Sequence, residues 1–116
     1  MTNRAFAGLA QDGWRNLAFE PFRDGVTAHW LERGGPDGPS LAILKYEPGA
    51  AVPRHRHRGL ETILVLDGAQ SDENGDYGAG TVVINPAGTE HSVWSRDGCA
   101  VLIQWTLPVE IIEGGT

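Results

Sequence analysis

Six Asp-Gly or Asn-Gly pairs divide this sequence into short segments. Glycine adopts the positive φ angles of tight hairpin turns easily, and Asn or Asp tolerates them, so these pairs are typical of β-hairpins. Between them lie runs rich in β-branched, aliphatic and aromatic residues, and no window repeats apolar residues at helical spacing over more than two turns. These runs are 26–32, 41–47, 60–66, 81–84, 90–95 and 100–106. Many short strands with regular turns predict an all-β sandwich or barrel.

The chain has 116 residues, which is enough for a buried core without disulfide bonds. It shows neither an internal repeat nor a linker, so we predict a single domain over residues 1–116. We expect its barrel core over residues 40–107. Residues 1–25 are predicted to form an N-terminal arm or an edge strand, whose apolar part is 15–22.

Charge and cysteine content exclude several classes of protein. The formal net charge is −6, which argues against a general nucleic-acid binder, because such proteins neutralise phosphates. The basic row Arg54, Arg56 and Arg58 is interpreted as a solvated or salt-bridged strand face, with the acidic residues 72–76 as partners. The single cysteine, Cys99, is expected to be buried and inert. With no membrane-spanning run and no secretory signal, we expect a cytoplasmic protein.

The first motif is GAAVPRHRHRGLETILVLDG, residues 49–68. Side chains alternate faces on a strand, so His55 and His57 point the same way and the neighbouring arginines point the other way. Glu61 has the same parity, but a straight strand would carry it roughly 20 Å from His55. The chain must therefore turn before Glu61 if all three are to reach one metal ion, and Gly59 permits such a turn.

The second motif is GTVVINPAGTEHSVWS, residues 80–95. A predicted strand ends at Asn85-Pro86, where proline fixes φ and the following Gly88 allows a sharp reversal. His91 then opens the next predicted strand.

Together the two motifs resemble those of the cupin superfamily. The first matches as Gly49-x5-His55-x-His57-x3-Glu61-x6-Gly68, and the second as Gly80-x5-Pro86-x-Gly88-x2-His91, with Ser95 in place of the usual closing Asn. The resemblance implies a double-stranded β-helix barrel of jelly-roll type. It also implies one metal ion held by His55, His57, Glu61 and His91.

Within the cupins, the chain is most similar to the cupin domain of ChrR-type anti-sigma factors. The similarity lies in YEPGAAVPRHRHRG, LVLDG, DENGDYGAG and the later DGC. It implies zinc first, although iron, manganese, nickel and copper suit the same donors. Residues 1–48 hold one histidine, His29, and no cysteine, so the helical zinc domain that binds the sigma factor is not seen and sigma-factor binding is not expected. Some relatives in this branch are dioxygenases of small diketones or aromatic ketones.

Five further residues are candidates for a ligand pocket, although each is more commonly a core or surface residue. They are Trp94, Gln104, Trp105, Tyr46 and His29. No nucleophile–base pair, phosphate-binding glycine loop or Cys-x-x-Cys motif is present. The histidines and Glu61 are therefore the only chemistry that the sequence shows. Hydrogen-bonded core histidines without a metal are the alternative.

Three functions remain open, and whether the protein is an enzyme is undecided. The first is a metal-binding ChrR-like protein that responds to a small molecule or an oxidant. The second is a metal-dependent dioxygenase of a diketone or aromatic ketone, in which Glu61 is a ligand or a base. The third is a dimer whose metal only braces the fold. A homodimer is expected in any case, with segments 15–22 and 109–112 covering a strand edge.

Overall fold

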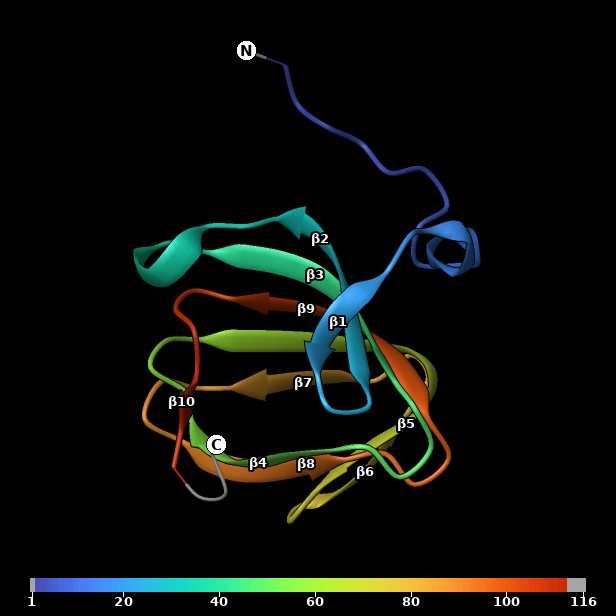
Figure 1. Ribbon diagram of the computed structural model, residues 1–116. Coiled ribbons are helices and arrows are strands. Elements are labelled where there is room, and N and C mark those ends of the chain that lie inside the picture. The colour runs from blue at the N-terminus through green and yellow to red at the C-terminus, as the bar shows by residue number, and fades with distance from the viewer. Residues whose placement is uncertain (1, 113–116) are drawn as a thin grey trace.

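The computed structural model describes residues 2–112, and the fold of that part is built almost entirely from strands (Figure 1). The strands are β1 (Glu20–Arg23), β2 (Val26–Glu32), β3 (Ser40–Tyr46), β4 (Ala51–Arg56), β5 (Glu61–Asp72), β6 (Gly75–Gly78), β7 (Val82–Asn85), β8 (Glu90–Trp94), β9 (Cys99–Trp105) and β10 (Glu110–Ile111). Two short 3₁₀ turns, η1 (Gly13–Asn16) and η2 (Gly35–Asp37), complete it.

The strands form two facing layers that close into a barrel of the jelly-roll type (Figure 1). All pairings are antiparallel, in the order β1-β2-β3-β9-β5-β8-β4-β10, and β6 and β7 also pair with β5. One layer holds β2, β3, β9, β7 and the first half of β5; the other holds β4, β8, β6 and the second half of β5. The predicted all-β barrel is confirmed.

The long strand β5 joins the two layers, and this corrects one prediction. The pair Asp67-Gly68 is not a hairpin turn. It lies at a bulge within β5, where the register against β9 shifts between Val65 and Asp67. Gly68 has φ +72° and packs against the backbone of Gly98. The bulge bends β5 from one layer into the other, so the strand continues to Asp72 instead of ending near residue 66.

Most other turn and strand predictions are confirmed. Asp24-Gly25 joins β1 to β2, Asn74-Gly75 joins β5 to β6, and Asp97-Gly98 joins β8 to β9. Asp12-Gly13 and Asp37-Gly38, in contrast, lie at the start of η1 and at the end of η2, and neither glycine has a positive φ. The end of segment 15–22 lies in β1, which among residues 2–112 pairs with β2 alone at one end of the strand order.

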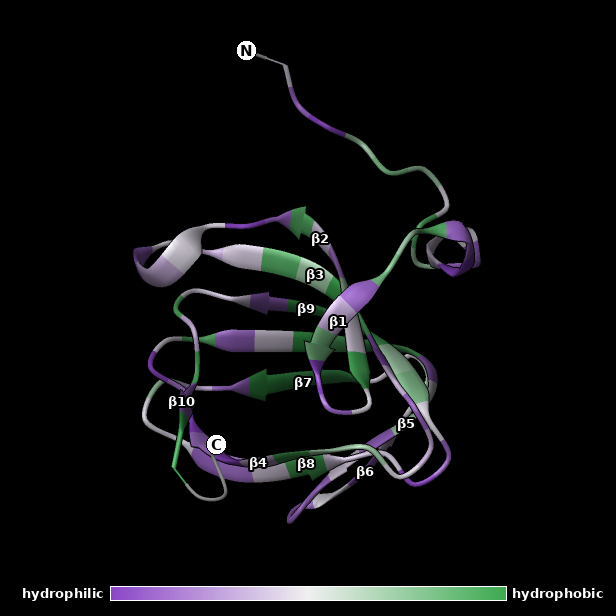
Figure 2. Cartoon of the chain, in the orientation of Figure 1, coloured by the Kyte–Doolittle hydropathy of each residue, from purple (hydrophilic) through white to green (hydrophobic). Residues whose placement is uncertain are grey.

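The buried side chains form two hydrophobic clusters. The larger fills the barrel and includes Val26, Ala42, Ile63, Val65 and Val101. The smaller lies on the outer side, where Trp14 packs with Leu31, Ile43 and Ala100, and the N-terminal residues Leu9, Leu17 and Phe19 cover them. Figure 2 shows hydrophobic colour along part of β3, a strand that contributes residues to both clusters. The N-terminal arm therefore covers one sheet face from outside.

The surface outside the barrel matches the charge pattern of the sequence. Arg54 lies 3.9 Å from Glu73 and 3.4 Å from Glu90, and Arg56 lies 2.8 Å from Glu90. The basic row is thus partly salt-bridged, as predicted. Cys99 is buried, and burial raises the pKa of its thiol. Among the described residues, no helix is long and apolar enough to cross a membrane.

Candidate metal centre

Two neighbouring strands of one layer, and the residue that follows one of them, bring three histidines together inside the barrel. His55 on β4 pairs directly with His91 on β8, and His57 follows the end of β4. One nitrogen from each ring lies within 4.8 Å of the others, and all three side chains are buried. The alternation of buried histidines with exposed or half-buried arginines follows the strand parity that the sequence predicts.

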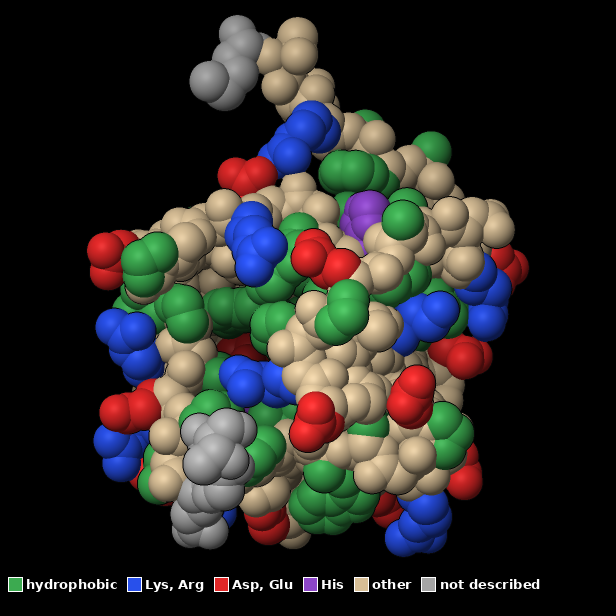
Figure 3. Space-filling view, in the orientation of Figure 1, with side chains coloured by type: hydrophobic (Ala, Val, Ile, Leu, Met, Phe, Trp, Pro, Cys, Tyr) green, Lys and Arg blue, Asp and Glu red, His purple; other side chains and the backbone are tan. Residues whose placement is uncertain are grey.

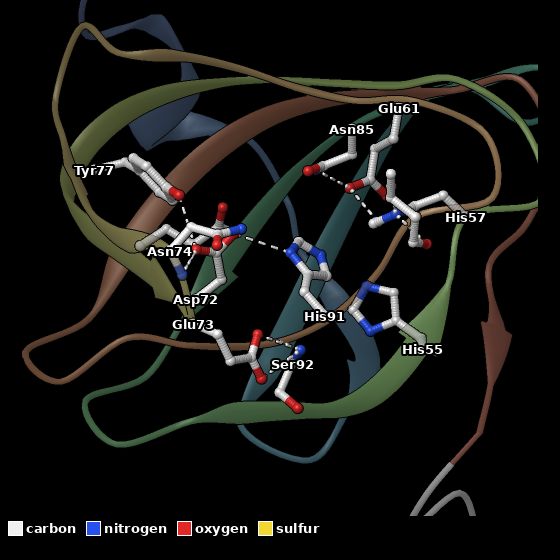
Figure 4. Close-up of polar contacts among 12 residues, drawn as sticks. His55, His57, Glu61, Asp72, Glu73, Asn74, Tyr77, Asn85, His91 and Ser92 are labelled. Carbon is white, nitrogen blue, oxygen red and sulfur yellow. Dashed lines mark hydrogen bonds and ion pairs between the residues drawn. The ribbon is translucent and has the colours of Figure 1, made fainter.

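Each imidazole is oriented by a hydrogen bond from its Nδ1–H, and Figure 4 shows the one that joins His91 to Asp72. His55 Nδ1 donates to the Pro53 carbonyl at 2.8 Å, and His91 Nδ1 donates to Asp72 Oδ2 at 3.0 Å. His57 Nδ1 lies 3.0 Å from the carbonyl and 2.9 Å from the hydroxyl oxygen of Thr89. These bonds place the proton on Nδ1 and leave a lone pair on each Nε2, which is the tautomer that a metal-binding histidine needs.

The Nε2 atoms of His57 and His91 are buried and have no hydrogen-bond partner among the described residues. A buried polar atom without a partner costs free energy, and few such atoms occur in folded proteins. Two of them meeting at one point are explained if a cation binds there. The donor set therefore fits a divalent transition metal.

Glu61 lies at the border of this cluster, at the start of β5. Its Oε1 is 3.2 Å from His57 Nε2 and accepts a hydrogen bond of 3.0 Å from Asn85 Nδ2. Because the His57 proton is on Nδ1, two electron-pair donors face each other across 3.2 Å without hydrogen-bond geometry. A cation shared between them relieves this repulsion. The three mutually close donor atoms are the histidine nitrogens, and Glu61 approaches them beside His57.

The predicted turn before Glu61 is present as a bend at residues 58–59. Gly59 has no positive φ, so it is not needed for left-handed backbone. Its role is close packing, because a Cβ there would come within 3.1 Å of Thr106 Cβ and 3.3 Å of the Leu107 nitrogen.

The electrostatics of the site favour a neutral His55 and an ionised Asp72. Burial is the main cause that lowers the pKa of His55, and the nearby His91 adds to it. Burial alone would raise the pKa of Asp72, but hydrogen bonds from Tyr77, His91 and the Asn74 amide outweigh it and leave the pKa lowered. Burial and the bond to Asp72 raise the pKa of Tyr77 to about 12. Asp72 thus stays ionised and holds His91 in place.

A cavity of about 50 Å³ adjoins the site, with His55 and Glu61 in its lining. Of the five pocket candidates, Tyr46 and Trp105 line this cavity, and Gln70 Nε2 lies 3.5 Å from the Tyr46 hydroxyl. Burial raises the pKa of Tyr46, so its hydroxyl stays protonated.

The other three candidates lie elsewhere, half-buried and outside the lining of this cavity. His29 donates from Nδ1 to the Ala18 carbonyl at 2.8 Å, and Gln104 Nε2 lies 3.5 Å from the Thr106 hydroxyl. Trp94 pairs with Ala51 and Ser71 at the junction of β8 with β4 and β5. None of the three shares a cavity lining with His55, as Tyr46 and Trp105 do.

The sequence did not reveal the partners that orient the histidines. Asp72 belongs to the acidic run that we expected to face the arginines, yet it turns inward to His91. The carbonyl of Pro53 carries no sequence signal at all. Asn85 and Thr89 flank the turn of the second motif, and their polar side chains next to Pro86 and Gly88 are the only available hint.

An antiparallel barrel with three inward histidines from two separate motifs is the architecture of a cupin. A family model described as the ChrR cupin-like domain matches residues 13–108, and the chain belongs to this family. It is 42% identical over 86 residues to the anti-sigma-E factor ChrR of Cereibacter sphaeroides, an alignment that covers 73% of this chain. The chain spans only 37% of that relative's length.

Solved structures agree with this family and fold. The ChrR chain in the complex of Rhodobacter sphaeroides SigE with the anti-sigma ChrR matches with a TM-score of 0.68 and 33% identity, over 78% of this chain and 49% of that one. An acetylacetone dioxygenase from Acinetobacter johnsonii matches with a TM-score of 0.73 over 84% of this chain and 74% of that one. At 17% identity, the second likeness concerns the fold alone.

Proposed function

We propose that this chain is a metal-binding module that responds to a small molecule or an oxidant. It binds one divalent transition metal, zinc first, through His55, His57 and His91, with Glu61 as the fourth ligand. The observation that carries the proposal is the pair of buried, unpartnered Nε2 atoms on His57 and His91. A tetrahedral set of three nitrogens and one carboxylate oxygen suits zinc.

The protein's own side chains prepare the site for a metal that supplies Lewis acidity and positive charge. The three Nδ1–H bonds fix the rings, and Asn85 holds the Glu61 carboxylate beside His57. If Glu61 leaves the metal, this same carboxylate is positioned to accept a proton in the adjoining cavity.

The size of that cavity favours a very small ligand. Its volume of about 50 Å³ is far below the roughly 300 Å³ at which pockets for drug-sized ligands begin. Water, dioxygen or hydrogen peroxide fits such a space. Tyr46 and Gln70 supply polar groups at its wall, which a purely bracing metal would not need.

The dioxygenase function is the alternative, and the neighbouring fold of an acetylacetone dioxygenase supports it at the level of architecture. A diketone would need a larger cavity than the one that Glu61 lines. The dioxygenase function therefore requires the side chains that line this cavity to move. A metal that only braces the barrel is the second alternative and predicts that no outside ligand reaches it.

Partners and location form part of the proposal as well. Sigma-factor binding is named for a relative of which this chain spans 37%, and we do not extend it to this chain. We propose a homodimer that forms through β7. Within the described residues this strand pairs with β5 alone, and it exposes Val82 and Ile84. We also propose a cytoplasmic location, where Cys99 stays reduced.

Substitution with cobalt tests whether the metal has an open position. The metal-free protein is loaded with Co(II), and visible spectra are recorded as azide, hydrogen peroxide or acetylacetone is added. The proposal predicts a spectral change with azide or peroxide at millimolar concentration. A change with acetylacetone would favour the dioxygenase, and an unchanged spectrum with all three would favour the bracing metal.

A further inference from the structure

A second, larger cavity lies outside the one beside the metal centre. Its volume is about 250 Å³, and it shares Phe22, Arg23, Trp105 and Val109 with the lining of the inner cavity. Figure 3 shows a hollow on this face of the molecule, bordered by hydrophobic side chains with basic side chains above and below it. A ligand in the outer cavity would therefore sit at the mouth of the inner one.

Three aromatic rings form one wall of the outer cavity. Trp30 meets Trp105 at 5.7 Å between ring centroids, and Phe22 meets Trp30 at 5.6 Å, both edge to face. Phe22 and Trp105 lie 6.4 Å apart. Trp30 and Phe22 are only half-buried, so part of each ring remains available for contact. Such a wall suits a flat, apolar group.

The charge of the lining is opposite to that of the chain. The protein has a formal charge of −6, yet this lining contains Arg23 and Arg33 and no carboxylate. Neither arginine makes an ion pair with any described residue, whereas Arg54 and Arg56 on the other layer are paired with glutamates.

Both guanidinium groups are already placed by the aromatic wall. Arg33 Cζ lies 4.4 Å from the Trp30 ring centroid, and Arg23 Cζ lies 5.2 Å from that of Phe22. Stacking of this kind leaves the N–H groups at the guanidinium edge free for a carboxylate, which arginine binds through two parallel hydrogen bonds. Because the side chains are held before binding, less conformational entropy is lost.

We propose that the outer cavity binds a small planar carboxylate, aromatic or conjugated, with its flat part on the aromatic wall and its carboxylate on Arg33 and Arg23. The inference rests on the proposed function in one respect: a bound carboxylate would control access of small molecules to the metal centre. The binding itself does not depend on the metal, because the arginines are outside the histidine cluster.

Calorimetric titration of the metal-loaded protein with trans-cinnamate tests the proposal, with trans-cinnamamide as the uncharged probe of the same shape. We expect saturable binding of cinnamate and about tenfold weaker binding of the amide. Arg33→Gln removes the charge from an exposed position and should weaken cinnamate binding about tenfold, while amide binding changes little. Arg23→Gln should act in the same direction.

Arg96→Gln is the matched control, because Arg96 is exposed, makes no ion pair with a described residue and does not line this cavity. It should leave cinnamate binding unchanged. Equal affinity for cinnamate and the amide, equal effects of the Arg33 and Arg96 variants, or no saturation by about 10 mM would overturn the inference.

Metal content measured in the same samples separates the two proposals. Metal retained without cinnamate binding contradicts only the carboxylate site. Cinnamate binding retained after the metal is removed by chelation supports that site whatever becomes of the metal centre. Loss of cinnamate binding on chelation, in protein that is still folded by circular dichroism, would mean that the carboxylate ligates the metal, and it would overturn the assignment to the arginines.

Discussion

At the scale of single residues, the site depends on which nitrogen of each histidine carries the proton. Three different acceptors, the Pro53 carbonyl, Thr89 and Asp72, each take an Nδ1–H and turn an Nε2 inward. Only Asp72 brings a full negative charge to this task. It should therefore contribute most to the basicity of its histidine and to the affinity for the metal.

Replacing Asp72 with Asn tests that contribution. Asn keeps a carbonyl oxygen for the Tyr77 and Asn74 bonds but loses the charge beside His91. Loss of such an outer partner should weaken zinc binding by about 10- to 100-fold. Competition with a fluorescent chelator measures the affinity. Asp67→Asn, at an exposed aspartate paired with Arg15, is the control and should bind zinc as the wild type does. Equal affinities in all three proteins would contradict the role given to Asp72.

Acid should destabilise both the metal-free and the metal-loaded protein. Burial lowers the pKa of His55 in the fold, so the unfolded chain takes up a proton at this residue first. Its contribution to stability is therefore complete above the unfolded-state pKa of about 6.5 and is lost as the pH falls from there toward the lowered folded pKa. Protons also compete with metal at every histidine.

Melting temperatures between pH 8 and pH 5 measure this dependence. Both forms should melt at lower temperature as the pH drops below about 6.5, and the metal-loaded form should lose more because its metal dissociates. Melting temperatures that stay constant over this range in both forms would show that neither His55 nor the metal is linked to folding.

At the scale of strands and turns, the sequence predicted the parts better than their connections. Runs such as 26–32 and 41–47 became β2 and β3 with shifts of at most one residue at each end, since turn residues bound them on both sides. Asp67-Gly68 could not be interpreted correctly in advance, because a bulge and a hairpin turn both need a glycine with positive φ. The structure identifies a bulge because β5 pairs with β9 on both sides of the register shift, which a hairpin turn would not allow.

Local sequence pattern likewise predicted the candidate metal ligands but not every residue that contacts them. His55 and His57 share a face by strand parity alone, and the two motifs supplied His91 and Glu61. Asp72 could not be assigned, because the bulge at Gly68 changes the face on which later residues of β5 point. The pairing of the short strand β10 with β4 depends on contacts across the barrel and left no local pattern.

Substitution of Gly68 should show how much stability the bulge contributes. In Gly68→Ala a Cβ would overlap the Gly98 carbonyl, and φ of +72° is unfavourable for alanine. We expect a loss of about 2 kcal/mol or more in the free energy of unfolding. Gly78→Ala is the control, since a Cβ there has no neighbour within 4 Å and φ is not positive. Urea denaturation compares the two variants, and equal stability would argue against a strained bulge.

At the scale of the whole molecule, the surfaces expected to form a dimer are partly used within the chain. Leu17 and Phe19 cover the outer cluster, and Ile111 in β10 pairs with His55 on β4. The exposed Val82 and Ile84 on β7 remain as an apolar edge, with exposed fractions of 57% and 53%. The expected dimer is thus better explained by β7 than by segments 15–22 and 109–112.

Light scattering at tens of micromolar should give twice the chain mass of 12.5 kDa. Val82→Lys should shift the protein toward the monomer, because the charge would be buried between two β7 strands. Ile112→Lys, at an exposed residue of the C-terminal segment, should leave the dimer intact. A wild-type monomer would contradict the dimer, and dissociation by the Ile112 variant alone would place the interface at that segment.

The central claim is that this barrel binds one metal through its histidines, and elemental analysis tests it most directly. Protein purified without a metal-affinity step is measured as wild type, as the double variant His57→Ala/His91→Ala, and as His29→Ala, which changes the histidine outside the site. We predict about one transition metal per chain in the wild type and in His29→Ala, and less than about a tenth of that in the double variant. Near-full metal content in a folded double variant, or none in the wild type after zinc is supplied, would contradict the account.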